Sequence, residues 1–197
     1  MTDWTSLDYV VVDVEGNGQH PPDLVELAAV RIVGGTIGSL STWLVRPKTP
    51  ITRFAESIHG ISNEQVSALP VFEDIKGEVL GALDGDALVA HNAHVDVGVL
   101  QRKLGDWQCP EVFDTLKLAR RLIPHQMSYK LGALVEAYKL AEGMPADLTP
   151  HRATYDVLVA AHLFIHMANP PGMEPLTLEA LRNHPPGGEG DEAATLF

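Results

Sequence analysis

The stretch Tyr9-Val10-Val11-Val12-Asp13-Val14-Glu15-Gly16 is the part of the sequence from which the fold can best be worked out. Its β-branched run, followed by a glycine and soon by two prolines, predicts a buried strand that leaves into a loop. Side chains alternate along a strand, so Asp13 and Glu15 would project from the same face, about 6.6 Å apart along the chain. Two carboxylates held there repel each other unless a hard divalent cation bridges them. Taken alone, however, such a pair is more often an ordinary solvated strand end.

Outward from this strand, the pattern predicts an α/β domain. Apolar runs at 24–33 and 37–45 flank Gly34-Gly35, which predicts a hairpin. Short helical pieces between 50 and 83 then lead to a strand at 87–90, which delivers polar residues at its C-terminal end. We expect a brief strand near 112–113 and helices up to 104 and at 115–123, 130–140, 152–167 and 176–182.

Composition limits the class of protein. The chain has 197 residues, with 14 Lys and Arg against 26 Asp and Glu, and a formal net charge of −12. Its length and its 45% hydrophobic content are typical of one globular domain with its own core. No run approaches the roughly 18 apolar residues of a membrane-spanning helix, so we expect a cytoplasmic protein without membrane contact. The acidic balance argues against a broadly basic surface for nucleic acid, but not against a local site whose carboxylates hold cations.

Two further polar clusters each contribute a carboxylate. His91-Asn92-Ala93-His94-Val95-Asp96 follows the strand at 87–90, and His151-Arg152-Ala153-Thr154-Tyr155-Asp156 opens an apolar helix. An ionised Asp156 in such a helix would be costly unless it paired with a cation. His151 lies five residues earlier, roughly 140° around a helix, so we expect it on the loop that enters the helix. There it would either act as a general base beside a metal held by Asp156 or form hydrogen bonds at the helix N-terminus.

Together, the three clusters resemble, in order and spacing, the three exonuclease motifs of the DEDDh family, the DnaQ-like 3′ to 5′ exonucleases. The stretches Val25-Glu26-Leu27-Ala28, Ile58-His59-Gly60-Ile61 and 114–122 are similar to the same family. The resemblance covers about residues 7–168, which we take as the exonuclease domain, with 169–197 as a C-terminal extension. It implies a ribonuclease H-like fold, with a central mixed five-stranded sheet flanked by helices. The first three strands would be antiparallel, and the later strands would run parallel to the first.

The resemblance also implies a mechanism with two divalent cations, Mg²⁺ or Mn²⁺. Asp13 would bridge both ions, Glu15 and Asp156 would complete one site, and Asp96 would hold the second ion, largely through water. His151 would deprotonate the attacking water. In-line attack on the last phosphodiester would release a nucleoside 5′-monophosphate from a nucleic acid 3′ end, with DNA as the preferred substrate, in repair or proofreading.

The candidate substrate-binding residues rest on weaker patterns. Gly16 and Asn17 stand where the family carries a stretch that contacts the terminal sugar and base, and His59 is a candidate for the terminal-nucleotide pocket by analogy only. Asn92 is a further candidate, although His91 and Asn92 more readily orient the loop that carries Asp96. For the polymer backbone we nominate a basic stretch that is equally compatible with an ordinary solvated helix face: Lys117, Arg120, Arg121, Lys130 and Lys139.

The sequence ends in Leu196-Phe197, after a segment rich in glycine, proline and acidic residues. This ending resembles the peptides by which bacterial replication proteins dock onto the sliding clamp, although Ala193 replaces their usual initial glutamine. An inert tail is the other interpretation.

Two alternative functions stay open. One is an RNA or oligoribonucleotide 3′ to 5′ exonuclease, because the sequence does not show how a 2′-hydroxyl is read. The other is a non-hydrolytic, clamp-docking binding subunit. The presence of all four acids and His151 counts against the binding subunit.

Overall fold

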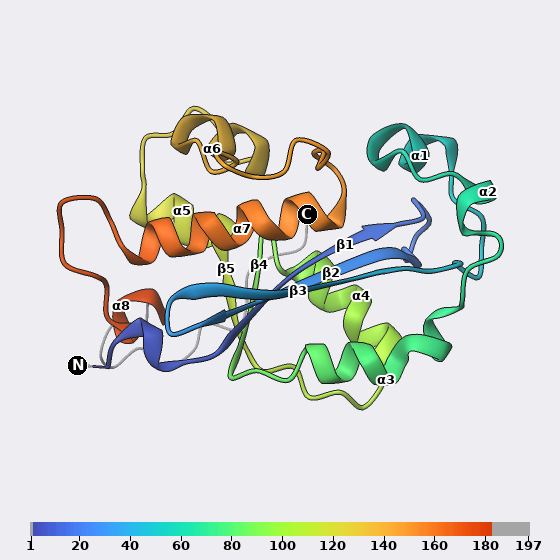
Figure 1. Ribbon diagram of the computed structural model, residues 1–197, viewed down its shortest axis with the longest axis horizontal. Coiled ribbons are helices and arrows are strands. Elements are labelled where there is room, and N and C mark those ends of the chain that lie inside the picture. The colour runs from blue at the N-terminus through green and yellow to red at the C-terminus, as the bar shows by residue number, and fades with distance from the viewer. Residues whose placement is uncertain (1, 183–197) are drawn as a thin grey trace.

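The computed structural model describes residues 2–182 and is built around a five-stranded sheet (Figure 1). The strands are β1 (Tyr9–Gly16), β2 (Leu24–Val33), β3 (Thr36–Leu44), β4 (Ala87–Ala90) and β5 (Glu111–Asp114). Their order in the sheet is β3-β2-β1-β4-β5. β1 pairs antiparallel with β2, as does β2 with β3, whereas β4 runs parallel to β1 and β5 parallel to β4. The mixed sheet predicted from the sequence is therefore confirmed.

Helices cover both faces of the sheet (Figure 1). The helices on one face are α5 (Thr115–Leu122), α6 (Leu131–Tyr138) and α7 (Ala153–Ala168), and those on the other are α3 (Phe72–Ala82) and α4 (His94–Leu104). Tyr9 and Val11 join the core beneath α7, whereas Val10 and Val12 join the core beneath α3 and α4. Because β1 is buried on both faces, its sequence is a continuous apolar run up to Asp13 rather than an alternating one.

Two short helices, α1 (Arg53–His59) and α2 (Asn63–Val66), lie beyond the end of β1 (Figure 1). The loop that follows β1 packs tightly against α1. Gly18 in this loop has a φ of +76°, and a Cβ there would collide with the hydroxyl oxygen of Thr52, the N-cap residue of α1. Only glycine satisfies both conditions, so this close approach fixes the path of the chain as it leaves β1.

The hydrophobic core extends beyond residues 7–168. Trp4, in the 3₁₀ helix η1 (Trp4–Ser6), is buried in the same cluster as β1 and α7. Leu178 and Leu181 of α8 (Leu178–Arg182) are buried there as well, and Asp3 forms a β-bridge with Thr177. Segments on both sides of 7–168 thus contribute to the core, and the division into an exonuclease domain at 7–168 and a C-terminal extension at 169–197 stays a prediction.

Two predictions concern the margins of the molecule. Leu196 and Phe197, the predicted partner-binding residues, lie outside the described residues. Within residues 2–182, no helix combines the length and the apolar character needed to cross a membrane.

Candidate active site

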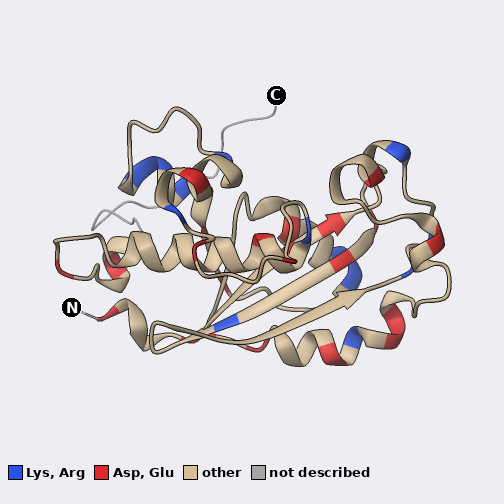
Figure 2. Ribbon diagram, turned by 45° about the horizontal axis from the view of Figure 1, so that its top comes forward, with Lys and Arg blue, Asp and Glu red and all other residues tan. Residues whose placement is uncertain are grey.

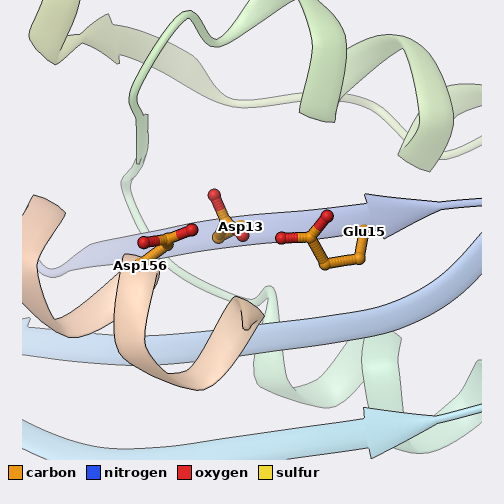
Figure 3. Close-up of side chains that lie close together, drawn as sticks. All are labelled: Asp13, Glu15 and Asp156. Atoms are coloured by element: carbon orange, nitrogen blue, oxygen red, sulfur yellow. The ribbon is translucent and has the colours of Figure 1, made fainter. Parts of the chain in front are cut away.

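Three carboxylates from two elements, β1 and α7, converge on one point (Figure 3). Asp13 and Glu15 project from the same side of β1, as strand alternation predicts, and Asp156 reaches toward them from the first turn of α7. One oxygen from each carboxylate lies within 4.8 Å of the other two. We call Asp13, Glu15 and Asp156 the acidic triad.

The acidic triad is electrostatically strained. Burial raises the pKa of Asp13 well above its usual range, and the charges of Asp96, Asp156 and Glu15 raise it further. Burial also raises the pKa of Glu15 to about 8 and that of Asp156 to about 6. Figure 2 shows the acidic segments of β1, β2 and the start of α7 close together.

One oxygen of Asp13, Oδ2, is buried and has no hydrogen-bond partner within residues 2–182. Buried carboxylate oxygens that repel one another and lack donors are the ligands that Mg²⁺ and Mn²⁺ accept. The residues present therefore fit the divalent cations that the resemblance implies.

Asp96 lies beside the acidic triad without being part of it. It occupies the first turn of α4, is buried, and its Oδ1 accepts a hydrogen bond of 3.0 Å from the backbone nitrogen of Val14. Burial raises the pKa of Asp96 to about 7. Among the neighbouring charges, that of Asp96 contributes most to the raised pKa of Asp13. All four predicted acids thus gather around β1, with one oxygen of Asp96 engaged by the strand's backbone.

His151 precedes α7 and is exposed, as predicted for a loop residue. Its backbone has a φ of 63°, and its nitrogen donates a hydrogen bond of 3.2 Å to Oδ2 of Asp156. The residue lines a cleft of about 760 Å³ together with Asp13 and Asp156. An exposed imidazole and two members of the acidic triad therefore border the same space.

Asp13, His151 and Asp156 form one wall of the cleft. A second wall is formed by α5 and by the segment between α5 and α6. Three of the predicted substrate-binding residues line it, namely Asn92, Arg120 and Lys130, and Met127 and Tyr129 add apolar surface.

His91 fastens this second wall to the sheet. Its Nδ1 lies 2.9 Å from Oγ1 of Thr115, and its Nε2 lies 3.0 Å from the carbonyl oxygen of Tyr129. Both ring nitrogens are thus engaged by α5 and the following loop, which fits the orienting role expected for His91.

The residues of the predicted basic stretch do not all line the cleft. Lys117 and Arg121 line a different hollow, of about 550 Å³, next to α8. Arg121 donates hydrogen bonds of 2.8 and 2.9 Å to the carbonyl oxygens of Ala180 and Leu181. This corrects the prediction for Arg121, because its guanidinium is engaged with the end of α8 rather than with the cleft.

The structure also corrects the prediction for Asn17. Its side chain is fully buried, its amide nitrogen donates to the backbone oxygen and the hydroxyl of Thr49, and its Oδ1 accepts from the backbone nitrogens of Gln19 and Asp23. The Asn17 side chain therefore holds the loop after β1 together and has no free group for a substrate.

Gly16 and His59 are neighbours at the end of β1. His59 is buried, and its Nδ1 accepts a hydrogen bond of 3.0 Å from the backbone nitrogen of Ile61. Burial lowers the pKa of His59, and the backbone of Gly16 opposes that shift. Contact of these two residues with a terminal nucleotide stays a prediction.

Sequence reasoning missed the role of an ion pair next to the acidic triad. Glu26 on β2 lies opposite Glu15 in the antiparallel register and binds Arg152, the residue before α7, through two hydrogen bonds of 2.6 and 3.0 Å. The signal was present in Val25-Glu26-Leu27-Ala28, because a carboxylate inside a buried apolar run requires a partner.

Asp114 is a second residue whose role was missed. Its carboxylate accepts hydrogen bonds from the backbone nitrogens of Asn92 and Ala93 and, as the N-cap of α5, from that of Leu116. It thereby fixes the loop that leads to Asp96.

Comparison with known proteins agrees with this site. Residues 10–164 match the RNase T exonuclease family. Exodeoxyribonuclease 10 of Escherichia coli K12 is 37% identical over 162 residues, which cover 82% of this chain and 69% of that protein. The 3′-5′ exonuclease DinG of Bacillus subtilis 168 is 36% identical over 166 residues, which cover 81% of this chain but 17% of that protein. The chain thus spans only a small part of the Bacillus relative.

A solved structure supports the same assignment. Exonuclease X in complex with 5′ overhanging duplex DNA has a TM-score of 0.70 and 34% sequence identity, covering 85% of this chain and 95% of that chain. This confirms the ribonuclease H-like fold that the sequence predicts. The chain therefore belongs to the RNase T exonuclease family of DnaQ-like 3′ to 5′ exonucleases.

Proposed function

We propose that this protein is a divalent-metal-dependent 3′ to 5′ exonuclease that hydrolyses the terminal phosphodiester of DNA and releases nucleoside 5′-monophosphates. The observation that carries the proposal is the convergence of the acidic triad beside a cleft that Asp13, Asp156 and His151 line together. Repair or proofreading of DNA ends is the process that such an activity would serve.

The chemistry follows from the side chains at the cleft. Asp13, Glu15 and Asp156 would hold Mg²⁺ or Mn²⁺, with Asp96 beside them. When bound, the cations would lower the pKa of a nucleophilic water and stabilise charge on the departing 3′ oxygen. The imidazole of His151 would accept the proton of the attacking water, since it is exposed and borders the same space.

DNA as the substrate is supported by two lines of argument. The relative with 37% identity is an exodeoxyribonuclease, and the similar solved structure contains duplex DNA with a 5′ overhang. In this chain, Arg120 and Lys130 place positive charge at the cleft, where they would contact backbone phosphates. Gly16, His59 and Asn92 are the residues that we propose for the terminal nucleotide.

The test offers 3′-labelled single-stranded DNA, duplex DNA with a 5′ overhang, and RNA of the same sequence to the protein with Mg²⁺ or Mn²⁺. We expect mononucleotides from DNA and a loss of about a thousandfold or more in Asp13→Asn. If mononucleotides are released from RNA but not from DNA, RNA and not DNA is the substrate. No metal-dependent release from any substrate would favour the binding subunit.

We also propose that Leu196 and Phe197 dock onto a sliding clamp. The proposal rests on the sequence alone, since both residues lie outside the described part of the chain. Deleting residues 193–197 should abolish binding to the clamp while leaving nuclease activity intact. Unchanged clamp affinity would exclude docking through this ending.

A further inference from the structure

Glu26 differs from the acidic triad in that both of its carboxylate oxygens have donors. Oε1 accepts a hydrogen bond of 2.6 Å from Nη2 of Arg152. Oε2 accepts from Nε of Arg152 at 3.0 Å and from the backbone nitrogen of Ala153 at 2.9 Å. Glu26 is 3% exposed, so these donors replace its water almost entirely. Because its oxygens already accept these hydrogen bonds, the carboxylate of Glu26 is poorly suited to bind a cation, unlike those of the neighbouring acidic triad.

The ion pair joins β2 to the start of α7. Arg152 is the N-cap residue of α7, and its own side chain does not cap the helix. The first amides of a helix need acceptors from elsewhere, and Glu26 supplies one of them from a different element. The fastening point is level with the acidic triad, because Glu26 lies opposite Glu15 in the β1–β2 register.

The two functional residues of this segment flank the fastening point. His151 immediately precedes Arg152, and the backbone nitrogen of Asp156 donates a 3.0 Å hydrogen bond to the carbonyl oxygen of Arg152. The backbone nitrogen of His151 in turn binds the carboxylate of Asp156. A displacement of Arg152 would therefore move both side chains relative to β1.

The acidic triad itself opposes this arrangement. Without cations, the charge of Asp156 is repelled by those of Asp13 and Glu15. A bidentate pair between an arginine and a carboxylate fixes distance and orientation together, which apolar packing farther along α7 does not do.

We propose that Glu26 and Arg152 are positioning residues, which hold the start of α7 so that Asp156 and His151 reach the metal site on β1. In this role the pair would contact neither cation nor substrate, and neither residue lines the cleft. This inference rests on the proposed function, because it assigns a role within the same site.

The direction in which the Mn²⁺ dissociation constant changes in Arg152→Gln distinguishes a positioning role from a purely electrostatic one. Arg152→Gln removes a positive charge near three acids, so a pair that acted through its charge alone would leave a site that binds Mn²⁺ more tightly. Positioning predicts the opposite, namely a Mn²⁺ dissociation constant raised about tenfold. Glu26→Gln should raise it to a similar extent. Isothermal titration calorimetry with Mn²⁺ alone measures both values.

Turnover gives a second readout. The p-nitrophenyl ester of thymidine 5′-monophosphate is a small substrate that needs no polymer contacts. We expect kcat for this ester to fall about tenfold or more in Arg152→Gln, with KM within about threefold of wild type. Arg152→Lys keeps the positive charge but cannot make the bidentate contact with Glu26, so its kcat should fall less than that of Arg152→Gln. If Arg152→Gln does not fold, Arg152→Lys takes its place in the test.

Glu111→Gln is the matched control. Glu111 on β5 holds Arg182 of α8 by the same kind of bidentate contact, at 2.7 to 3.1 Å, away from the acidic triad. The Glu111→Gln variant should therefore bind Mn²⁺ with the same dissociation constant as the wild-type protein.

The outcomes are distinct. Arg152→Gln protein that binds Mn²⁺ as tightly as wild type, or more tightly, overturns the positioning role. Wild-type protein that binds Mn²⁺ but degrades no nucleic acid, while both variants bind Mn²⁺ weakly, rejects the proposed function and keeps this inference. Wild-type protein that binds no Mn²⁺ rejects both.

Discussion

His151 is held in a backbone conformation that is uncommon for a residue other than glycine. Its φ of 63° lies in the left-handed region, which costs about 1–2 kcal/mol for a residue with a Cβ. The hydrogen bond from its backbone nitrogen to Asp156 offsets part of this cost. Because the backbone carries this contact, the imidazole stays exposed at the cleft.

The first prediction concerns His151→Ala. We expect kcat to fall about 10²- to 10⁴-fold, the usual contribution of a general base. The Mn²⁺ dissociation constant should stay within about twofold, because the backbone contact to Asp156 persists. Steady-state kinetics and calorimetry measure the two quantities. His94→Ala, which removes another exposed histidine away from the cleft, serves as the control. An equal loss of metal affinity would instead make His151 a ligand or a structural support.

The second prediction contrasts two adjacent arginines. Arg120 lines the cleft, so Arg120→Ala should raise KM for polymeric DNA several-fold and weaken its dependence on salt. Arg121 binds two carbonyl oxygens of α8, so Arg121→Ala should lower the free energy of unfolding by about 1–3 kcal/mol while leaving KM unchanged. Kinetics across a salt series and urea denaturation distinguish the two effects. Similar changes in both variants would contradict this division of roles.

At the scale of elements, the contact between the loop after β1 and α1 determines how the chain leaves the acidic triad. Asn17 anchors this loop through its side chain, and Gly18 permits the close approach to Thr52. The backbone nitrogen of Thr52 also donates to the carbonyl oxygen of Asn17. The strand that carries Asp13 and Glu15 is therefore held by a compact polar network at its end.

The third prediction tests this contact with two glycines. Gly18→Ala should cost about 3 kcal/mol, from left-handed strain together with the collision with Thr52. Gly60, the C-cap of α1, has a similar φ of +73°, but nothing lies within 4 Å of a Cβ placed there. Gly60→Ala should therefore cost only about 1–2 kcal/mol. Urea denaturation compares the two, and equal costs would show that the collision is relieved.

The elements and the site differ in how far the sequence predicts them. The hairpin around Gly34-Gly35 and the apolar helix after Arg152 have local signals, and both are confirmed. β1 extends two residues beyond its β-branched run, because Glu15 and Gly16 still pair with β2. The roles of Asn17, Arg121 and Glu26 depend on partners 32, 59 and 126 residues away, and no local pattern specifies such partners.

At the scale of the whole molecule, the chain carries a formal charge of −12, and three of its acidic side chains meet unfavourably at the acidic triad. Ordinary surface acids ionise at little cost, whereas buried neighbouring acids oppose one another. Stability of the metal-free protein should therefore depend on pH above the range in which acids usually titrate.

The fourth prediction follows from the raised pKa values. Burial raises the pKa to about 6 for Asp156, about 7 for Asp96 and about 8 for Glu15. The folded protein thus binds protons more tightly than the unfolded chain, and stability is lost as pH rises from about 4 to about 8. Urea denaturation in EDTA across this range should show the decline, and Mg²⁺ should restore more stability at pH 8 than at pH 5.5. Glu15→Gln should remove the upper part of the decline, and a flat profile for wild type would contradict the expectation.

The order of the elements along the chain has a consequence for protein synthesis. Asp13 and Glu15 leave the ribosome early on β1, whereas Asp156 arrives only with α7, and Trp4 is covered only once Leu178 and Leu181 have been made. Because a domain folds as a unit, β1 becomes fully buried only after α7 and α8 have been synthesised. A nascent chain therefore holds an incomplete set of acids, and cutting of nucleic acid begins only after translation has passed α7.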